Sequence, residues 1–272
     1  MCFEVSQDYE TLDLLADPER LGKEIQKYQE SKSGMFSNTF SAFGFVPLTT
    51  SMEPSKFDSW IKGFETDKEY STLPKRKQYL QKWFKQSDHA HIEYLQLPTF
   101  FSIDPDFKSV PGKRYHTIMT GLLHPLSRGS VHISSSDPFS EPIINPAYLE
   151  HPLDADQLLS GVRFLQKVAS TGPFGKAVIG PYDPPASADT DEAVKDWIRG
   201  KAEPFYHPVG TAAMLPKEDG GVVDSQLKVY GTKNLRIADA SVIPVLFSAH
   251  IQATVYAIAE KAADLILNDN KQ

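Results

Sequence analysis

Two histidines stand in segments of the sequence that would hold a side chain in one orientation. His207 begins the run HPVGTAAM, in which Pro208 favours an extended backbone at the histidine, and Gly210 with Thr211 indicates a tight turn. His250 directly precedes a helix-like run, so it would lie beside backbone N–H groups that lack partners within the helix. Since an imidazole has an ordinary pKa of about 6.5, either residue could exchange a proton near neutrality. Acid–base chemistry is therefore one hypothesis for both, and turn stabilisation or capping is the structural alternative.

The other six histidines give weaker signals. His89 and His91 are two residues apart in a strand-like segment, which would place both side chains on one side and is compatible with a metal ion. Because no third His, Asp or Glu ligand stands on an identifiable element nearby, we expect no metal site. Surface or hydrogen-bonded core positions are expected for the remainder, His116, His124, His132 and His151.

Composition excludes several classes of function. The chain has 272 residues, 40% hydrophobic and 23% charged, which is typical of a globular protein with one large or two small domains. The net charge is −7 and no basic stripe is present, so we expect neither nucleic acid nor membrane as a partner. The start of the chain lacks a basic segment followed by an apolar run, so we expect no secretion signal, and cytoplasmic localisation is only a default. The single cysteine, Cys2, excludes an internal disulfide and a thiolate metal cluster.

The elements that must position these residues follow from periodicity. Apolar residues at helical spacing, with start and stop signals, predict helices at 18–34, 54–63, 74–87, 154–169, 191–199 and 251–267. Period-two alternation predicts strands at 91–97, 116–123 and 129–134, with a short strand at 235–238. Proline and glycine make 172–188 the expected loop or domain crossing. Together they predict an α+β fold: an antiparallel sheet of about five or six strands flanked by helices from both ends of the chain.

Three well-known motifs are absent from the sequence. No two glycines are spaced i, i+2, so there is no GxGxxG turn of the kind that cradles a dinucleotide pyrophosphate. No Walker loop is present, and no GxSxG is found either, which argues against an α/β-hydrolase. Any phosphate-bearing ligand would therefore lack the usual primary cradle.

Four runs of residues nevertheless form a recognisable set. HPVGTAAM from 207, NLRIADASVIP from 234 and SAHIQATVYAIAEKAADLIL from 248 resemble the carboxy-terminal signature of glucose-methanol-choline (GMC) oxidoreductases. Upstream, LLHPLSRGSVHISSSDPFSEPIINPAYLEHPLDADQLLSGVRF resembles the substrate-domain segment of the same family. The resemblance covers most of the chain beyond about residue 12, and the fungal aryl-alcohol oxidases and dehydrogenases are the most similar members.

The resemblance implies a reaction and two catalytic residues. In GMC oxidoreductases FAD lies between a dinucleotide domain and a sheet-based substrate domain, and a hydride passes from an alcohol carbon to flavin N5. His207 matches the residue that takes the hydroxyl proton, and His250 matches the second member of the pair, which hydrogen-bonds the same oxygen. Both must reach one oxygen atom, so we expect their rings to approach each other near one cleft.

The resemblance also implies contacts to the cofactor. Asp239 and Ala240 match positions that meet the ribityl and pyrophosphate portion of FAD, although a turn acid at the end of a strand is the structural alternative for Asp239. Ile251 and Gln252 match the helix start whose amides face the pyrimidine edge of the flavin, where negative charge accumulates on reduction.

The chain departs from the family in length. Family chains are about twice as long, and their first half supplies the GxGxxG turn and much of the flavin cradle. The resemblance therefore implies a substrate-binding domain at 1–206 and a segment at 207–272 that would complete a flavin site. We expect weak or absent FAD binding, and a separate flavin-domain polypeptide or self-association as the way to complete the site.

Two other functions remain open from the sequence. The imidazole pair could serve a flavin-free acid–base enzyme, a cyclase, isomerase or dehydratase, acting without redox chemistry. The chain could also be a non-catalytic remnant that binds a partner through apolar surface. The leading hypothesis is an FAD-dependent oxidoreductase acting on a primary or aryl alcohol.

Overall fold

The computed structural model describes residues 1–38, 42–68, 74–105 and 107–269. Its backbone contacts divide the chain into two compact units, each built from three separate stretches of sequence. Unit 1 comprises Met1–Glu53, Ile92–Leu122 and Ala155–Ala202, and unit 2 comprises Pro54–His91, Leu123–Asp154 and Glu203–Gln272. The predicted division into 1–206 and 207–272 concerns functional roles, whereas these units are defined by contacts. The predicted division therefore stays a prediction.

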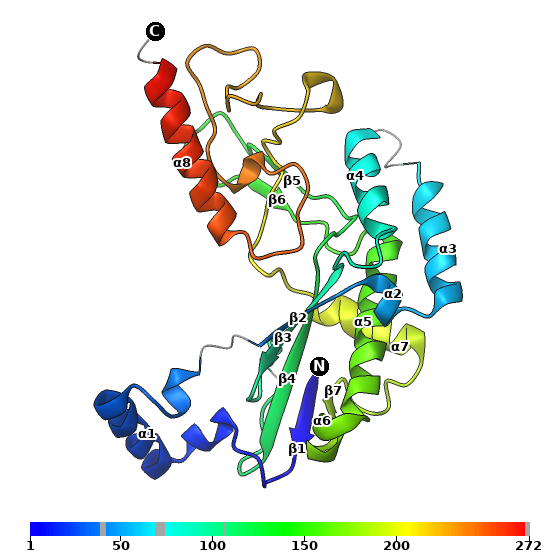
Figure 1. The fold of residues 1–272 in the computed structure, drawn as a ribbon, viewed down its shortest axis with the longest axis vertical. Coiled ribbons are helices and arrows are strands. Elements are labelled where there is room, and N and C mark those ends of the chain that lie inside the picture. Colours follow the sequence, from blue (N-terminus) through cyan, green and yellow to red (C-terminus); the bar gives the residue numbers. More distant parts are fainter. Residues whose placement is uncertain (39–41, 69–73, 106, 270–272) are drawn as a thin grey trace. The chain divides into compact units, whose positions relative to one another are not determined.

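Unit 1 contains a five-stranded antiparallel sheet in the order β2-β3-β4-β1-β7 (Figure 1). The strands are β1 (Cys2–Val5), β2 (Phe43–Val46), β3 (Ile92–Leu97), β4 (Arg114–Leu122) and β7 (Val178–Asp183). In β4 the side chains of Tyr115 and Thr117 are buried on one face, as period-two alternation requires. The prediction of an antiparallel sheet flanked by helices is confirmed.

The helices of unit 1 are α1 (Pro18–Ser31), α2 (Leu48–Ser51), α5 (Pro152–Ala169), α6 (Gly172–Ala177) and α7 (Asp191–Lys201), of which α5 begins in unit 2. On α5, Ala155, Leu159, Val162 and Leu165 are buried, which is the predicted stripe. Gly161 lets this helix approach the sheet, because a Cβ there would stand 2.6 Å from Thr120 Cγ2.

Two predicted boundaries in unit 1 are wrong. The first helix ends at Ser31, and Lys32, whose backbone is left-handed with φ 53°, caps it in place of Gly34. The stretch 172–188 was predicted as a loop, but it contains α6 and β7. The prediction took its prolines and glycines as signs of a loop. However, β7 is the edge strand of the sheet and pairs with β1, and an edge strand tolerates proline.

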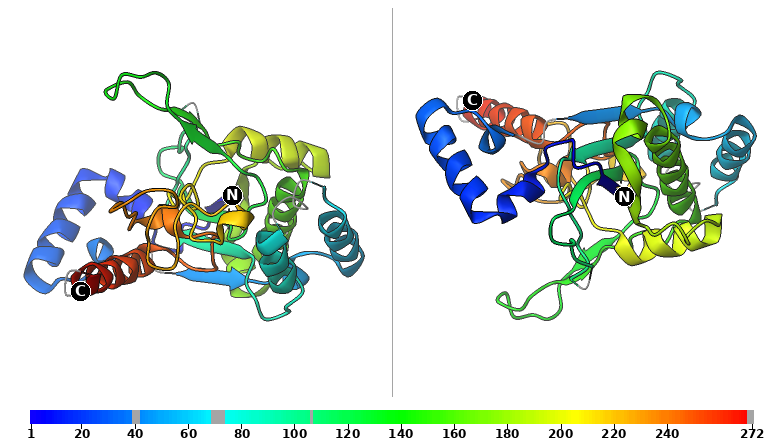
Figure 2. Two further views of the ribbon diagram at one scale, coloured as in Figure 1. Left: turned by 90° about the horizontal axis from the view of Figure 1, so that it is seen from above. Right: turned by 90° about the horizontal axis from the view of Figure 1, so that it is seen from below.

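Unit 2 contains α3 (Pro54–Glu65), α4 (Pro74–Phe84) and α8 (Gln252–Asp269). Strands β5 (Ser130–His132) and β6 (Ile143–Asn145) pair with each other as a two-stranded ribbon (Figure 2). Aromatic rings fix the α3–α4 pair, since Phe84 meets Trp60 and Phe64 edge-on at centroid distances of 4.7 and 5.2 Å. A second apolar cluster holds α8 through Ala262, against Val223, Leu227 and Val242.

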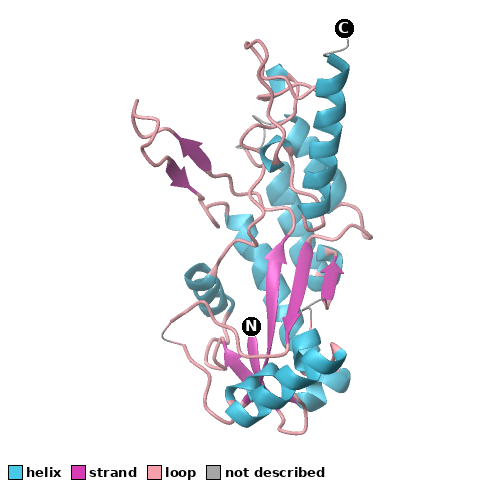
Figure 3. Ribbon diagram, turned by 90° about the vertical axis from the view of Figure 1, so that its left-hand side faces the viewer, coloured by secondary structure: helices cyan, strands magenta, loops and turns pink. Residues whose placement is uncertain are grey.

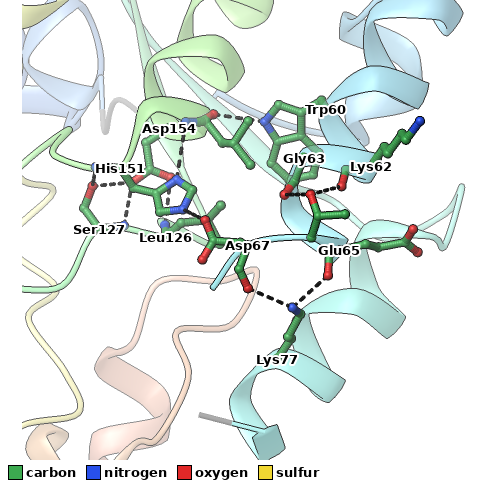
Figure 4. A network of polar contacts seen from close by, with 12 residues as sticks. Trp60, Lys62, Gly63, Glu65, Asp67, Lys77, Leu126, Ser127, His151 and Asp154 are labelled. Atoms are coloured by element: carbon green, nitrogen blue, oxygen red, sulfur yellow. Dashed lines mark hydrogen bonds and ion pairs between the residues drawn. The ribbon is translucent and has the colours of Figure 1, made fainter. Parts of the chain in front are cut away.

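A polar network joins three segments of unit 2 (Figure 4). Asp154 accepts hydrogen bonds from the backbone N–H groups of Leu126 and Ser127, both at 2.7 Å, and from Ser127 Oγ at 2.7 Å. Ser127 Oγ accepts in turn from His151 N, and His151 Nε2 lies 3.0 Å from Asp67 Oδ2. Every one of these contacts lies within unit 2, and together they hold its three segments to one another.

The stretch that leads to α8 is mostly loop (Figure 3). The strand predicted at 235–238 is wrong: one bridge, between Lys228 and Arg236, replaces it. Leu227 and Asn234 both have left-handed backbones, with φ 61° and 58°, which bend the chain before a ladder can extend. Across the described ranges, none of the helices combines the length and apolar character that crossing a bilayer requires.

Candidate active site

His207 and His250 lie together in unit 2 although they are far apart in the sequence. Their ring centroids are 5.1 Å apart and the ring planes are inclined by 56°. The ring of His207 is half-buried and that of His250 is exposed. The expected approach of the two imidazoles is therefore observed, and both can be reached from solvent. A hollow in this unit, between 214–218 and 223–230, contains neither ring.

A tight turn positions His207. The residue before it, Tyr206, has a left-handed backbone with φ 57°, and Gly210 has φ 89°, a conformation that glycine adopts without steric cost. Ser241 O accepts hydrogen bonds from Gly210 N at 3.1 Å and Ala212 N at 3.0 Å. The predicted turn is thus present, and it is fastened to the backbone that follows Asp239.

A second turn and the start of α8 position His250. Ala249 N donates to Phe247 O at 2.8 Å, which closes a tight turn directly before the histidine. On the other side, Ile251 is buried at 7% exposure, and its carbonyl accepts the first bond of the helix, from Val255 N. His250 therefore lies where the first N–H groups of α8 begin, as predicted.

The four predicted cofactor residues lie on these same segments. Asp239 is exposed and its Oδ1 accepts from Ser241 N at 2.7 Å, which is the turn-forming role of the structural alternative. Ala240 follows it and is half-buried. The helix begins at Gln252, which is exposed, whereas Ile251 points into the core. Their contacts to a cofactor stay a prediction.

Three further histidines form a compact cluster in unit 2. His91 and His124 are buried at 0% and 1% exposure, and His89 is half-buried. Burial lowers the pKa of His91 to about 4 and that of His124 to about 3, and it also lowers the pKa of His89. All three are therefore neutral at pH 7.

The expected geometry for His89 and His91 is wrong in one respect. Strand β3 begins at Ile92, so neither histidine lies on a strand, and their rings approach at 5.4 Å through the turn that precedes it. Within the part of the chain that the structure describes, no group of three His, Cys, Asp or Glu side chains is arranged to hold a metal ion.

Sequence reasoning missed the contacts that this cluster makes. His124 Nδ1 lies 2.7 Å from Leu246 O, and its Nε2 lies 3.0 Å from Ser248 Oγ. His124 had no distinguishing context in the sequence, and Ser248 was noticed only as part of the run SAHI. The only sign of the cluster in the sequence was the apolar residues that follow His89 and His124, because such residues indicate segments that enter a core.

The sequence of this chain is similar to proteins of one known family. Residues 125–259 match the family model described as GMC oxidoreductase. Dehydrogenase mpl7 of Monascus purpureus is 32% identical over 277 aligned residues, which cover 94% of this chain and 44% of that protein. The predicted resemblance is confirmed.

Solved structures agree with this comparison. The formate oxidase of Aspergillus oryzae RIB40, in a structure that concerns FAD modification, matches with a TM-score of 0.77 and 30% identity over 99% of this chain and 45% of that one. A fungal aryl-alcohol oxidase matches with a TM-score of 0.73 and 27% identity over 100% of this chain and 47% of that one. The chain thus spans about half the length of the proteins that it matches.

Proposed function

This chain belongs to the GMC oxidoreductases, whose carboxy-terminal portion it matches, and on that premise we propose that it supplies the proton-transfer groups of an FAD-dependent enzyme that oxidises a primary or aryl alcohol. The observation that carries the proposal is the pair of imidazoles, 5.1 Å apart at the end of two tight turns. One substrate oxygen between them would meet both rings.

The two histidines take different roles. His207 accepts the hydroxyl proton through an unprotonated ring nitrogen, which an imidazole offers near neutral pH. His250 donates an N–H to the same oxygen and stabilises the negative charge that develops there. When bound, FAD would supply the electron acceptor that takes a hydride from the alcohol carbon. The proton held by His207 then leaves to solvent, to which the pair is open.

The residues present fit one end of FAD. Gln252 stands exposed at the start of α8, an 18-residue helix, and the first N–H groups of a helix favour negative charge. Ala240 is small, so backbone can approach a ligand there, and the resemblance matches it to the ribityl and pyrophosphate portion of FAD. The start of α8 suits the flavin ring. The sequence offers no glycine-rich turn for the pyrophosphate.

Partial fit has a consequence for binding. The chain holds the groups for the ring but lacks the motif for the rest of the cofactor, so we propose that FAD binds weakly to this chain alone. A separate flavin-domain polypeptide would supply the missing contacts. Association with that polypeptide, or of two copies of this chain, would precede catalysis.

Visible absorbance tests the proposal directly. The purified chain is titrated with FAD alone and with a flavin-domain polypeptide, and stable flavin absorbance is expected only in the second mixture. In that complex, His207→Ala should lower alcohol oxidation by about 10²- to 10⁴-fold, the contribution of a general base. His132→Ala is the matched control, because His132 is an exposed histidine of the same unit. Colourless protein in both mixtures would refute flavin-linked activity.

The imidazole pair also favours one other function. Both rings belong to this chain and lie close together, so they could transfer protons in a flavin-free cyclase, isomerase or dehydratase. Turnover by flavin-free protein that His207→Ala abolishes would identify that function. Turnover that survives both His207→Ala and His250→Ala would exclude it.

A further inference from the structure

Three side chains fasten the backbone that leads to His250. We call His89, His124 and Ser248 the histidine clamp. His89 Nε2 lies 2.8 Å from His124 Nε2, and Ser248 Oγ lies 3.1 Å from the former nitrogen and 3.0 Å from the latter. Ser248 Oγ also donates to Ala90 O at 2.7 Å. The clamp therefore links residues 89–90 and 124 with the segment that precedes α8.

The hydrogen atoms of the clamp can be assigned from its acceptors. Leu246 O can only accept, so His124 donates to it from Nδ1, at 2.7 Å. The single hydroxyl hydrogen of Ser248 is directed to Ala90 O, which also can only accept. A neutral His124 then offers the lone pair of Nε2, and His89 must donate to it from Nε2. This assignment of donors and acceptors holds whether or not His89 carries a second proton, because that proton would bind at Nδ1 of His89.

Aromatic packing keeps the two rings in place. His89 and His124 lie almost parallel, with centroids 5.0 Å apart and an angle of 19° between the planes. Trp83 stacks on His89 at 5.2 Å and contacts His124 at 4.8 Å. The clamp is thus built from rings that cannot turn without losing these contacts.

The position of the clamp decides what it can do. His124 binds the carbonyl of Leu246, and Ser248 binds the carbonyl of Ala90. The turn from Phe247 to Ala249 encloses Ser248, and Ile251 is anchored in the core. His250 is the residue between these two anchors. Its backbone is therefore fixed from both sides within two residues.

We propose that His89, His124 and Ser248 are positioning residues for His250, which hold its imidazole against that of His207. The inference rests on the proposed function of the pair, but it concerns a property of this chain without cofactor or substrate. It assigns a role to two histidines and a serine that come from three separate segments of the sequence.

Nuclear magnetic resonance of the chain with isotope-labelled histidine tests the proposal. In the unaltered chain we expect a nuclear Overhauser effect between the rings of His207 and His250, and the Nδ1–H tautomer for His124. Ser248→Ala should abolish the first signal and shift the ring resonances of His250. Ser127→Ala is the matched control, because Ser127 Oγ also makes two hydrogen bonds, to Asp154 and from His151, in the other network of the same unit. It should lower stability similarly and leave both signals in place.

Three further variants keep the test decisive if Ser248→Ala fails to fold. Ser248→Thr retains a hydroxyl and should retain the ring-to-ring signal. His89→Gln retains a donor at the position of Nε2 and should also retain it, whereas His89→Leu should lose it. Persistence of the signal in His89→Leu and Ser248→Ala, or its equal loss in Ser127→Ala, would overturn the proposal. Since no measurement uses flavin or alcohol, failure of the proposed function would leave this result unaffected.

Discussion

Unit 2 contains two groups of histidines that differ in surroundings and therefore in chemistry. His91 and His124 are buried, stack on aromatic rings and direct ring nitrogens at the backbone carbonyls of Trp83 and Leu246. The ring centroids of His207 and His250 are 5.1 Å apart, and both residues are open to solvent. The same side chain is thus a fixed hydrogen-bond donor in the core in one place and a group that a ligand can reach in the other.

The difference shows how a fold selects one of two uses for imidazole. Burial disfavours the charged ring, and a carbonyl acceptor fixes which nitrogen carries the hydrogen, so the buried histidines cannot exchange protons at neutral pH. His207 is half-buried and His250 is exposed, so a substrate oxygen can reach both rings. A histidine that must accept a proton during a reaction therefore needs its position held by backbone turns, which is what the segments around 207 and 250 provide.

Acidification is the strongest test of this contrast. The pKa of His91 is lowered to about 4 and that of His124 to about 3, whereas an unfolded histidine titrates near 6.5. Below the unfolded value the unfolded chain binds more protons, so stability is fully present above it and is lost as the pH falls toward the folded values. Together the two residues should lower the free energy of unfolding by about 4 kcal/mol between about pH 7.5 and about pH 5.

Urea unfolding at a series of pH values measures this effect. His124→Leu should remove about half of the pH dependence that these two residues produce, and His91→Leu should remove the other half. A pH dependence that neither substitution reduces would show that the two buried histidines do not cause it.

Sequence patterns predicted the elements that carry their own periodic signal. The apolar spacing along 154–169 and 251–267 indicated α5 and α8 to within a few residues. The strands β1, β2 and β6 went unpredicted because each has only three or four residues, whereas β5, which is equally short, was predicted as part of the longer alternating run 129–134. The strand expected at 235–238 failed because two left-handed residues, Leu227 and Asn234, bend the chain there.

The candidate site was predictable for a different reason. His207 and His250 each stand beside a local signal, a proline with a glycine turn and a helix start, and the resemblance to GMC oxidoreductases paired them. The histidine clamp has no such signal, since Ser248 meets His89 across 159 positions and His124 across 124 positions. Only the folded chain brings those atoms together.

Substitution by leucine sharpens the comparison at neutral pH. His124→Leu should lower the free energy of unfolding by about 2–3 kcal/mol, because it leaves the carbonyl of Leu246 without its donor in a partly buried site. His250→Leu, on an exposed side chain, should change it by less than about 0.5 kcal/mol. Urea unfolding of the two variants measures the difference. Equal losses would contradict the division into buried structural histidines and solvent-exposed ones.

The smallest expected effect concerns the frame of the exposed pair. Asp239 Oδ1 accepts from Ser241 N, and Ser241 O in turn holds the turn after His207. Asp239→Ala should lower the free energy of unfolding by about 1 kcal/mol, since the amide can turn to water at this exposed site, and Asp239→Asn should retain the bond and most of the stability. Hydrogen exchange at Ser241 should quicken in Asp239→Ala alone. A loss in Asp239→Ala as large as that in His124→Leu would mean that the exposed pair depends on side-chain polar contacts as strongly as the buried cluster does.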